Sequence, residues 1–122
     1  MPWNLDNDRP IYLQLMERIR LDIIAGIYKP GDKLPSVRDL ALDAAVNPNT
    51  MQKALSELER EELVYSQRTS GRFITEDENM LKQLKTDLAE EQIRQFFEKM
   101  KQLGFTGSET LALIENVLKE ER

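Results

Sequence analysis

Polar side chains at the start of one predicted helix could read the edges of nucleic-acid bases. The pair Asn47-Pro48 is typical of a helix N-terminus, with Asn as the cap and Pro at the first helical position. From a helix in the major groove, amide and hydroxyl side chains reach base edges, and Asn or Gln can form two hydrogen bonds to adenine. The chain supplies such side chains, together with a lysine, at Asn49, Thr50, Gln52 and Lys53.

This predicted helix can approach phosphates without repulsion, because no acidic residue lies between Asp43 and Glu57. An ordinary solvated helix face, with Asn47 acting only as the cap, accounts for the same residues. The helix on its own does not separate the two interpretations.

Positive charge near this helix comes from a predicted β-hairpin. Arg68 and Arg72 lie in it, and no acidic residue occurs between Glu62 and Glu76. A basic wing that follows the DNA backbone or enters the minor groove needs such a segment. Lysine and arginine at hairpin tips also protect strand edges from aggregation, so the hairpin alone fits a solubility role as well.

A second source of positive charge precedes the recognition-helix candidate, residues 47–60. Ser36, with Asp39 three residues later, predicts the N-terminus of a short helix. Lys33 and Arg38 lie beside it and could reach phosphates at the edge of the groove. The free backbone N–H groups at these helix starts would also face phosphate oxygens. Each basic residue taken singly is more often a surface charge, but their grouping around one helix N-terminus favours contacts with DNA.

Composition excludes most other chemistry. The 122 residues include no Cys and no His, which removes disulfides, thiol nucleophiles, imidazole bases and ordinary zinc sites. Only carboxylate-bound metals remain, and the adjacent pairs Glu61-Glu62 and Glu90-Glu91 would point in different directions on a helix. We therefore expect no enzyme activity, no metal and no cofactor. The sequence has no run of about 18 apolar residues and no signal peptide, so we expect a cytoplasmic protein without a membrane partner.

Hydrophobic periodicity and turn residues predict a mainly α fold with a small β-hairpin. Helices are expected over residues 10–25, 36–44 and 47–60, followed by strands at 63–66 and 72–75. This order of elements is that of a winged helix-turn-helix, and it would be followed by a short region of two helices.

The boundary between two regions is expected near Thr75. Residues 1–75 form the predicted winged helix-turn-helix DNA-binding domain and carry ten basic and eleven acidic side chains. Residues 76–122 form a predicted helical dimerisation tail with seven basic and eleven acidic side chains. The excess negative charge therefore belongs mainly to the tail rather than to the candidate DNA surface.

The tail is predicted to contain two amphipathic helices. The first starts at the capping pair Thr75 and Glu78 and ends near Leu103, and the second starts at Thr106. One winged-helix domain can cover only part of their apolar faces, so we expect helices from two chains to pack together in a homodimer. The candidate interface residues are Leu84, Leu88, Ile93, Phe96, Phe97, Met100, Leu103, Phe105, Ile114 and Leu118.

Two alternatives remain open for the tail. Its helices could fold back on their own domain instead of pairing with a second chain. Its aromatic and methionine residues could also bind a small molecule, although such residues at helical spacing are much more often core. The sequence identifies no effector ligand.

One stretch of the chain resembles the N-terminal signature of GntR-family transcriptional regulators. The signature reads Gly26-x3-Pro30-Gly31-Asp32-x-Leu34-Pro35-Ser36-x-Arg38-x-Leu40-Ala41. Two further segments are similar to the YtrA-type subfamily in particular: Pro10-Ile11-Tyr12-x-Gln14, and Asn47-Pro48-Asn49-Thr50 followed by Leu55, Leu58 and Glu59. In that subfamily a short helical region used for dimerisation stands where other branches carry a large effector domain. The resemblance covers residues 10–75 in detail and the tail by length and helical character.

The resemblance implies specific DNA contacts and also shows departures. It places a wing glycine at Gly71, whereas Glu62 and Thr69 stand where the family usually has glycine. A wing tip with a single glycine is expected to sit differently on DNA. The positions that the resemblance assigns to DNA contacts are Ser36, Arg38, Asn47, Asn49, Thr50 and Gln52.

These observations predict a homodimeric repressor of transcription that binds an inverted-repeat operator in double-stranded DNA. The resemblance further implies that the controlled operon contains the regulator's own gene and an ABC transporter. The main alternative is a winged-helix protein-interaction module without specific DNA binding, which the acidic pI of 4.9 favours. The acid-free helix start and hairpin favour the DNA-binding hypothesis, because an interaction module would not need them.

Overall fold

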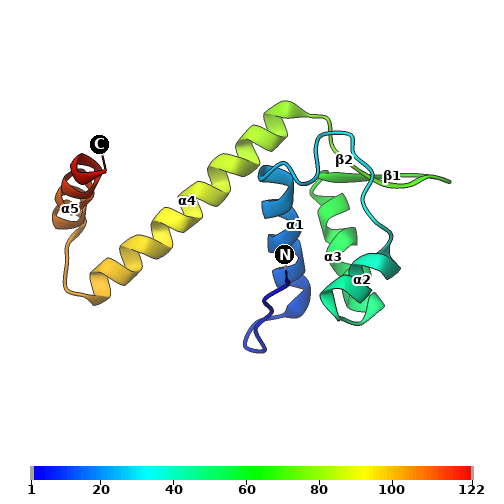
Figure 1. Ribbon diagram of the computed structural model, residues 1–122, viewed down its shortest axis with the longest axis horizontal. Coiled ribbons are helices and arrows are strands. Elements are labelled where there is room, and N and C mark those ends of the chain that lie inside the picture. The colour runs from blue at the N-terminus through cyan, green and yellow to red at the C-terminus, as the bar shows by residue number, and fades with distance from the viewer. Residues whose placement is uncertain (1, 122) are drawn as a thin grey trace. The chain divides into compact units, whose positions relative to one another are not determined.

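The computed structural model describes residues 2–121, and the predicted mainly α fold with one hairpin is confirmed (Figure 1). The elements in chain order are α1 (Ile11–Ile24), α2 (Val37–Ala44), α3 (Pro48–Arg60), β1 (Val64–Gln67), β2 (Gly71–Ile74), α4 (Glu78–Gln102) and α5 (Gly107–Glu120). Helices α1, α2 and α3 followed by the hairpin form the winged helix-turn-helix. In the described part of the chain, none of the helices is both long enough and apolar enough to cross a membrane.

The core of the winged helix-turn-helix lies where α1 and α2 pack on α3. Apolar residues three and four positions apart share one face of each helix, and these faces meet. Leu15 and Ile19 of α1 and Met51, Leu55 and Leu58 of α3 have no solvent exposure at all. Burying each such side chain stabilises the fold by about 1.5–3 kcal/mol, so this core holds α3 rigidly.

The predicted helix caps at Ser36, Asn47 and Thr106 are confirmed. The Ser36 hydroxyl accepts from the Asp39 N–H at 3.1 Å, and the Asn47 side chain accepts from the Asn49 N–H at 2.8 Å. At the start of α5, Thr106 and Glu109 form a complete reciprocal capping box.

The predicted capping pair Thr75 and Glu78 is wrong, because Asp77 caps α4. Its carboxylate accepts from the Met80 N–H at 3.1 Å. The Thr75 hydroxyl accepts from the Asp77 N–H at 3.1 Å and so supports the turn before the helix. Asp and Thr are both favoured at the cap position, and no local signal ranks Thr75 and Asp77, which lie two positions apart.

The hairpin strands are shifted by one residue from the predicted 63–66 and 72–75. They pair antiparallel from Val64 opposite Ile74 to Gln67 opposite Gly71. Leu63 is left out because its N–H donates to the Leu58 carbonyl at the end of α3. A single bridge between Lys33 and Phe73 adds the loop before α2 to the same small sheet.

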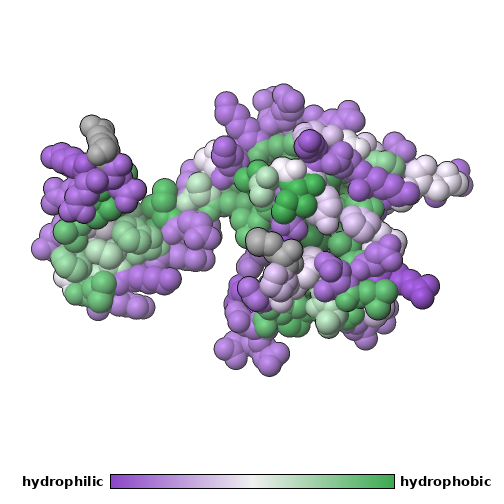
Figure 2. Space-filling model, in the orientation of Figure 1, coloured by the Kyte–Doolittle hydropathy of each residue, from purple (hydrophilic) through white to green (hydrophobic). Residues whose placement is uncertain are grey.

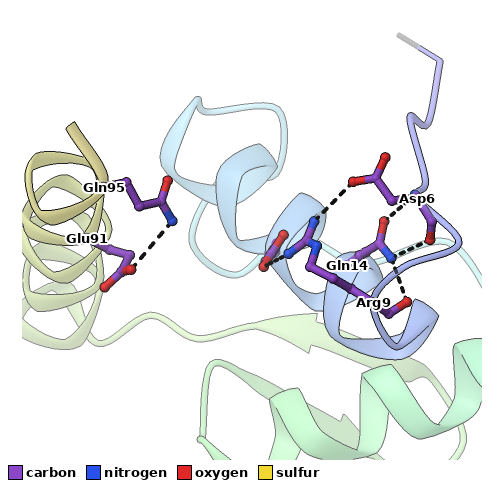
Figure 3. A network of polar contacts seen from close by, with 6 residues as sticks. Asp6, Arg9, Gln14, Glu91 and Gln95 are labelled. Atoms are coloured by element: carbon purple, nitrogen blue, oxygen red, sulfur yellow. Dashed lines mark hydrogen bonds and ion pairs between the residues drawn. The ribbon is translucent and has the colours of Figure 1, made fainter. Parts of the chain in front are cut away.

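An N-terminal strap, residues 2–10, lies on the helices, which the sequence did not reveal. Buried Gln14 of α1 holds it: its side chain donates to the Asp6 and Arg9 carbonyls at 2.8 and 2.9 Å and accepts from the Asp6 N–H at 2.6 Å (Figure 3). Trp3 donates to Asp43 of α2 at 2.8 Å, and the Arg18 guanidinium lies 4.6 Å from the centre of its ring. The strap therefore ties α1 to α2.

The chain separates into two compact units, the first running through Leu84 and the second starting at Lys85. The first two turns of α4 belong to the first unit, because Met80, Leu81 and Leu84 pack against its core. Leu84 was predicted at a dimer interface; it is half-buried against the core of its own chain, and its place at an interface stays a prediction. The domain boundary near residue 75 stays a prediction, as do the DNA-binding and dimerisation roles assigned to its two sides.

Candidate nucleic-acid interface

The start of α3 presents its polar residues outward. Asn49, Gln52 and Lys53 are exposed and Thr50 is half-buried. The Asn47 side-chain oxygen is already used as the helix cap, and the Gln52 amide donates to Ser56 at 3.2 Å along the helix. The Asn49 side chain makes no hydrogen bond within the described residues, so its amide is available to a base edge.

Lys53 lies against α1. Its ammonium is 4.0 Å from the centre of the Tyr12 ring, a cation–π contact that limits the directions in which it can extend. Lys53 therefore lies toward the α1 side of α3, and the amides of Asn49 and Gln52 form the rest of the polar face.

An open groove of about 890 Å³ separates the start of α2 from the hairpin. One side of the groove is the N-terminus of α2, with unpaired backbone N–H groups and the exposed Arg38. The other side is the wing tip with Thr69 and Ser70. The groove brings together predicted DNA-contact residues from distant parts of the sequence, namely Lys33, Ser36, Arg38, Gly71 and Arg72.

Two observations favour glycine at position 71 in the wing. Its φ of +104° is a conformation that residues with a Cβ rarely adopt. A Cβ at this position would also lie 3.1 Å from Cε of Lys33, whose side chain crosses the base of the wing tip. The tip therefore stays narrow on the side that faces the groove. Arg68, at the tip itself, is exposed and forms no ion pair within the described residues.

Arg72 is half-buried and its guanidinium turns to a carboxylate of the same chain. Its guanidinium pairs with the carboxylate of Glu59 in the last turn of α3, and the Ser66 hydroxyl donates to the same oxygen at 2.7 Å. Partial burial raises the pKa of Glu59, but the hydrogen bonds from Ser66 and Arg72 and the charge of Arg72 together bring it below its ordinary value. The charge that the sequence assigned to DNA contact is thus already neutralised by Glu59.

The second unit presents a large apolar surface. Among its described residues only Thr110 is buried, and its hydroxyl donates to the Thr106 carbonyl at 2.8 Å. Figure 2 shows hydrophobic surface along the end of α4 and α5. Leu88, Phe97, Met100 and Ile114 are half-buried, whereas the exposed predicted interface residues are Ile93, Phe96, Leu103, Phe105 and Leu118. Leu111, Leu113 and Val117 are also exposed and are not among the predicted interface residues.

No group of three or more acidic side chains that could hold a metal ion occurs in residues 2–121. Polar α3 residues, the groove and the wing form one face of the first unit suited to a nucleic acid.

Comparison with known proteins identifies the family. The family described as "Bacterial regulatory proteins, gntR family" matches residues 11–74, which run from the start of α1 to the end of β2. The chain belongs to the GntR family. It is 42% identical over 105 residues to the uncharacterised HTH-type transcriptional regulator YhcF of Bacillus subtilis, covering 86% of this chain and 87% of that protein.

A second relative supports the YtrA-like subfamily. The chain is 44% identical over 94 residues to the HTH-type transcriptional repressor YtrA of Bacillus subtilis, covering 77% of this chain and 68% of the relative. As the resemblance predicted, this GntR-family chain is YtrA-like and is a transcriptional regulator with a winged-helix DNA-binding fold.

Solved structures agree with this assignment. A GntR family transcriptional regulator from Listeria monocytogenes superposes with a TM-score of 0.82 at 38% identity, covering 92% of this chain and 98% of that one. The DNA-binding domain of AraR in complex with operator ORX1 superposes with a TM-score of 0.53 at 29% identity, covering 62% of this chain and 92% of that one.

Proposed function

We propose that this GntR-family regulator is a repressor that binds an inverted-repeat operator as a homodimer, with α3 in the major groove. The observation that carries the proposal is the acid-free polar face at the start of α3, beside a groove lined by Ser36, Arg38 and the wing tip. The likeness to AraR bound to its operator supports the use of this face for DNA.

Separate residues would read bases and bind phosphates. We assign base reading to Asn49, Thr50 and Gln52, because their amides and hydroxyl lie in the first turns of α3. We assign phosphate binding to the basic side chains and helix starts around the groove, because these carry no sequence information. The residues that we assign to phosphate binding are Lys33, Ser36, Arg38, Asn47, Lys53 and Arg68, and Gly71 shapes the wing tip.

Dimerisation would come from the second unit. Ile93, Phe96 and Leu118 leave an apolar surface on α4 and α5 that water contacts in the single chain. Burial of such a surface between two copies is favourable, and a two-fold dimer matches the symmetry of an inverted repeat.

The YtrA-like subfamily supports an inference about which genes this regulator controls. We infer that the controlled operon contains the regulator's own gene and an ABC transporter. A repressor acts on the chromosome, so we place the protein in the cytoplasm.

The decisive experiment is fluorescence anisotropy of the purified full-length protein with DNA from upstream of its own gene. A scrambled duplex of the same composition serves as the competitor across a salt series. We expect binding that resists the competitor, at two chains per duplex. Equal affinity for native and scrambled DNA, followed by a genome-wide selection that recovers no preferred fragment, would refute the proposal.

Two variants test the assignment of contacts. We expect Asn49→Ala to cost about 1–3 kcal/mol and to relax specificity at one base pair. We expect Arg38→Ala to weaken all duplexes alike and to reduce the salt slope by about one unit. Identical behaviour of the two variants would show that the assignment is wrong.

A protein-interaction module is the second candidate function. The acidic pI of 4.9 favours it, because many DNA-binding domains are strongly basic. The uneven distribution of charge argues against it, since most of the excess negative charge lies in the tail and acidic residues are absent from the start of α3 and the wing tip.

A further inference from the structure

The wing of this regulator is joined to α3 by one polar link. Glu59 receives the Arg72 guanidinium from β2 and the Ser66 hydroxyl from β1. Ser66 and Arg72 are directly opposite each other in the hairpin, so a single carboxylate on α3 holds both strands at the same level. The side chains of Glu59 and Arg72 are 31% and 19% exposed, which shields the pair partly from water.

The link acts where the hydrophobic core no longer reaches. Val64 and Ile74 at the base of the hairpin are buried, whereas the outer residues of both strands and the turn are exposed or half-buried. The link lies one residue pair from the turn, since the next pair is Gln67 with Gly71. On the β2 side the loop before α2 pairs with the hairpin, and the Leu34 N–H donates to the Arg72 carbonyl at 2.8 Å. The Glu59 link adds a second support that also holds β1, and a short hairpin that is only marginally stable by itself gains from it.

We propose that Glu59 and Arg72 are positioning residues that hold the wing at a fixed orientation to α3, and that Arg72 is not itself a DNA contact. This inference rests on the proposed DNA-binding function. It reassigns a basic residue from a DNA contact to an ion pair within the chain, and it gives an acidic residue near the DNA a favourable role.

General electrostatics makes the opposite prediction, which makes the inference testable. Replacing Glu59 by Ala removes a negative charge close to the DNA and releases the positive charge of Arg72. Both changes would tighten DNA binding and steepen its salt dependence if charge alone mattered. If the link positions the wing, the same substitution weakens DNA binding, because the wing tip no longer lies where the DNA backbone passes.

Glu57 offers a matched control. It lies two residues earlier on α3, is 28% exposed, and pairs with Arg60 of the same helix at 3.2 Å. Glu57→Ala therefore removes the same charge from the same helix and breaks an ion pair of α3 without touching the hairpin.

The first measurement needs no DNA. The chain has no native cysteine, so Thr69→Cys at the wing tip and Ser56→Cys on α3 accept two spin labels specifically. Labelled protein is diluted with unlabelled protein, so that only distances within one chain contribute to double electron–electron resonance. We expect one narrow distance distribution in the parent and with Glu57→Ala, and a broadened one with Glu59→Ala. An unchanged width with Glu59→Ala would overturn the proposal.

The second measurement uses unlabelled full-length variants on the operator. We expect Glu59→Ala to weaken specific binding by roughly three- to tenfold, as suits a partly exposed charged link, while Glu57→Ala leaves binding unchanged or tightens it. Thermal unfolding by circular dichroism checks that both variants fold. Tighter binding with Glu59→Ala would overturn the proposal.

Two measurements test the role of Arg72. They are the salt dependence of DNA binding and the additivity of Arg72→Ala with Arg68→Ala. We expect Arg68→Ala to weaken binding in the parent but to add little in the Arg72→Ala background, because the displaced wing no longer presents Arg68. Additive losses, with one unit of salt slope for each arginine, would make Arg72 a phosphate contact and overturn the proposal. Absence of specific binding in the parent would refute the proposed function itself, while the spin-label result would still report on the link.

Discussion

The two units of this regulator use their apolar residues in opposite ways. The first unit holds all fifteen residues of the buried hydrophobic core, from Leu15 to Ile74. In the described part of the second unit the larger apolar side chains are exposed or half-buried, and α4 contributes no buried residue. The first unit has what it needs to fold alone, whereas the second leaves its main source of stabilisation unused in the single chain.

We interpret this difference as a division of roles. A self-contained core holds α3 rigidly, which recognition of a fixed DNA shape requires. An incomplete core is suited to the proposed dimer, in which a second chain would supply the missing contacts.

The largest expected effect comes from placing a charge on the apolar surface of the second unit. Leu118→Glu should give a monomer and lower operator affinity about 100-fold or more, because the two half-sites are then bound independently. Sedimentation velocity and anisotropy measure the two losses. Leu21→Glu in α1 is the control, since Leu21 is 52% exposed and Leu118 is 57% exposed. A monomeric Leu21→Glu variant, or a dimeric Leu118→Glu variant, would remove the distinction between the units.

Leucine truncation compares the two cores directly. Leu55→Ala should cost about 2–5 kcal/mol of the free energy of unfolding at any protein concentration, because Leu55 has no exposure. Leu103 is 71% exposed in the single chain, so Leu103→Ala should matter only through the dimer. Its effect in urea unfolding should therefore depend on protein concentration. A concentration-independent loss of the same size would place Leu103 in a core of its own chain.

A smaller and stabilising effect is expected at the end of α3. Glu62 has a φ of +67°, a left-handed conformation that costs residues with a Cβ about 1–2 kcal/mol. Glu62→Gly relieves this cost but loosens the unfolded chain, so we expect a net gain of roughly 0.5–1 kcal/mol. Urea unfolding measures it. Glu62→Ala is the control, because it removes the charge and keeps the strain, and an equal gain with Ala would attribute the effect to charge.

The smallest expected effect is the pH dependence of the wing link. The pKa of Glu59 is lowered in the folded protein, so its contribution to stability is present above the pKa of the unfolded chain and lost as pH falls through the folded value. We expect the stability difference between the parent and Glu59→Gln, below about 1 kcal/mol for such an exposed pair, to be constant above about pH 5 and to shrink below about pH 4. A difference that grows on acidification would contradict this.

Much of the first unit was predictable because its signals are local. Hydrophobic periodicity predicted the three helices, whose buried faces include Leu15, Ile19, Leu55 and Leu58, and the caps at Ser36 and Asn47 predicted where two of them begin. The left-handed backbone at Glu62 also agrees with the glycine that is usual there in the family. Such features depend on residues within one or two turns, so one sequence carries them.

Contacts between distant residues were not predictable from the same signals. Arg72 is thirteen positions from Glu59, and Trp3 is forty positions from Asp43. Nothing in local sequence distinguishes an arginine that reaches a phosphate from one that turns back to a carboxylate. The same limit applies to Leu84, whose apolar character fits either a dimer interface or its own domain.

Residue types and their order were enough to predict a winged helix-turn-helix with a polar, acid-free helix start and a helical tail, and to exclude thiol and imidazole chemistry. Periodicity, capping and turn preference act over a few residues, so they can be recognised in the sequence without knowledge of the fold. The partner of Arg72, the grouping of Arg38 with the wing tip, and the strap held by Gln14 depended on the folded chain. Those contacts arise where packing of the core brings surface side chains together, and the energies of competing partners differ by too little for any local pattern to choose among them.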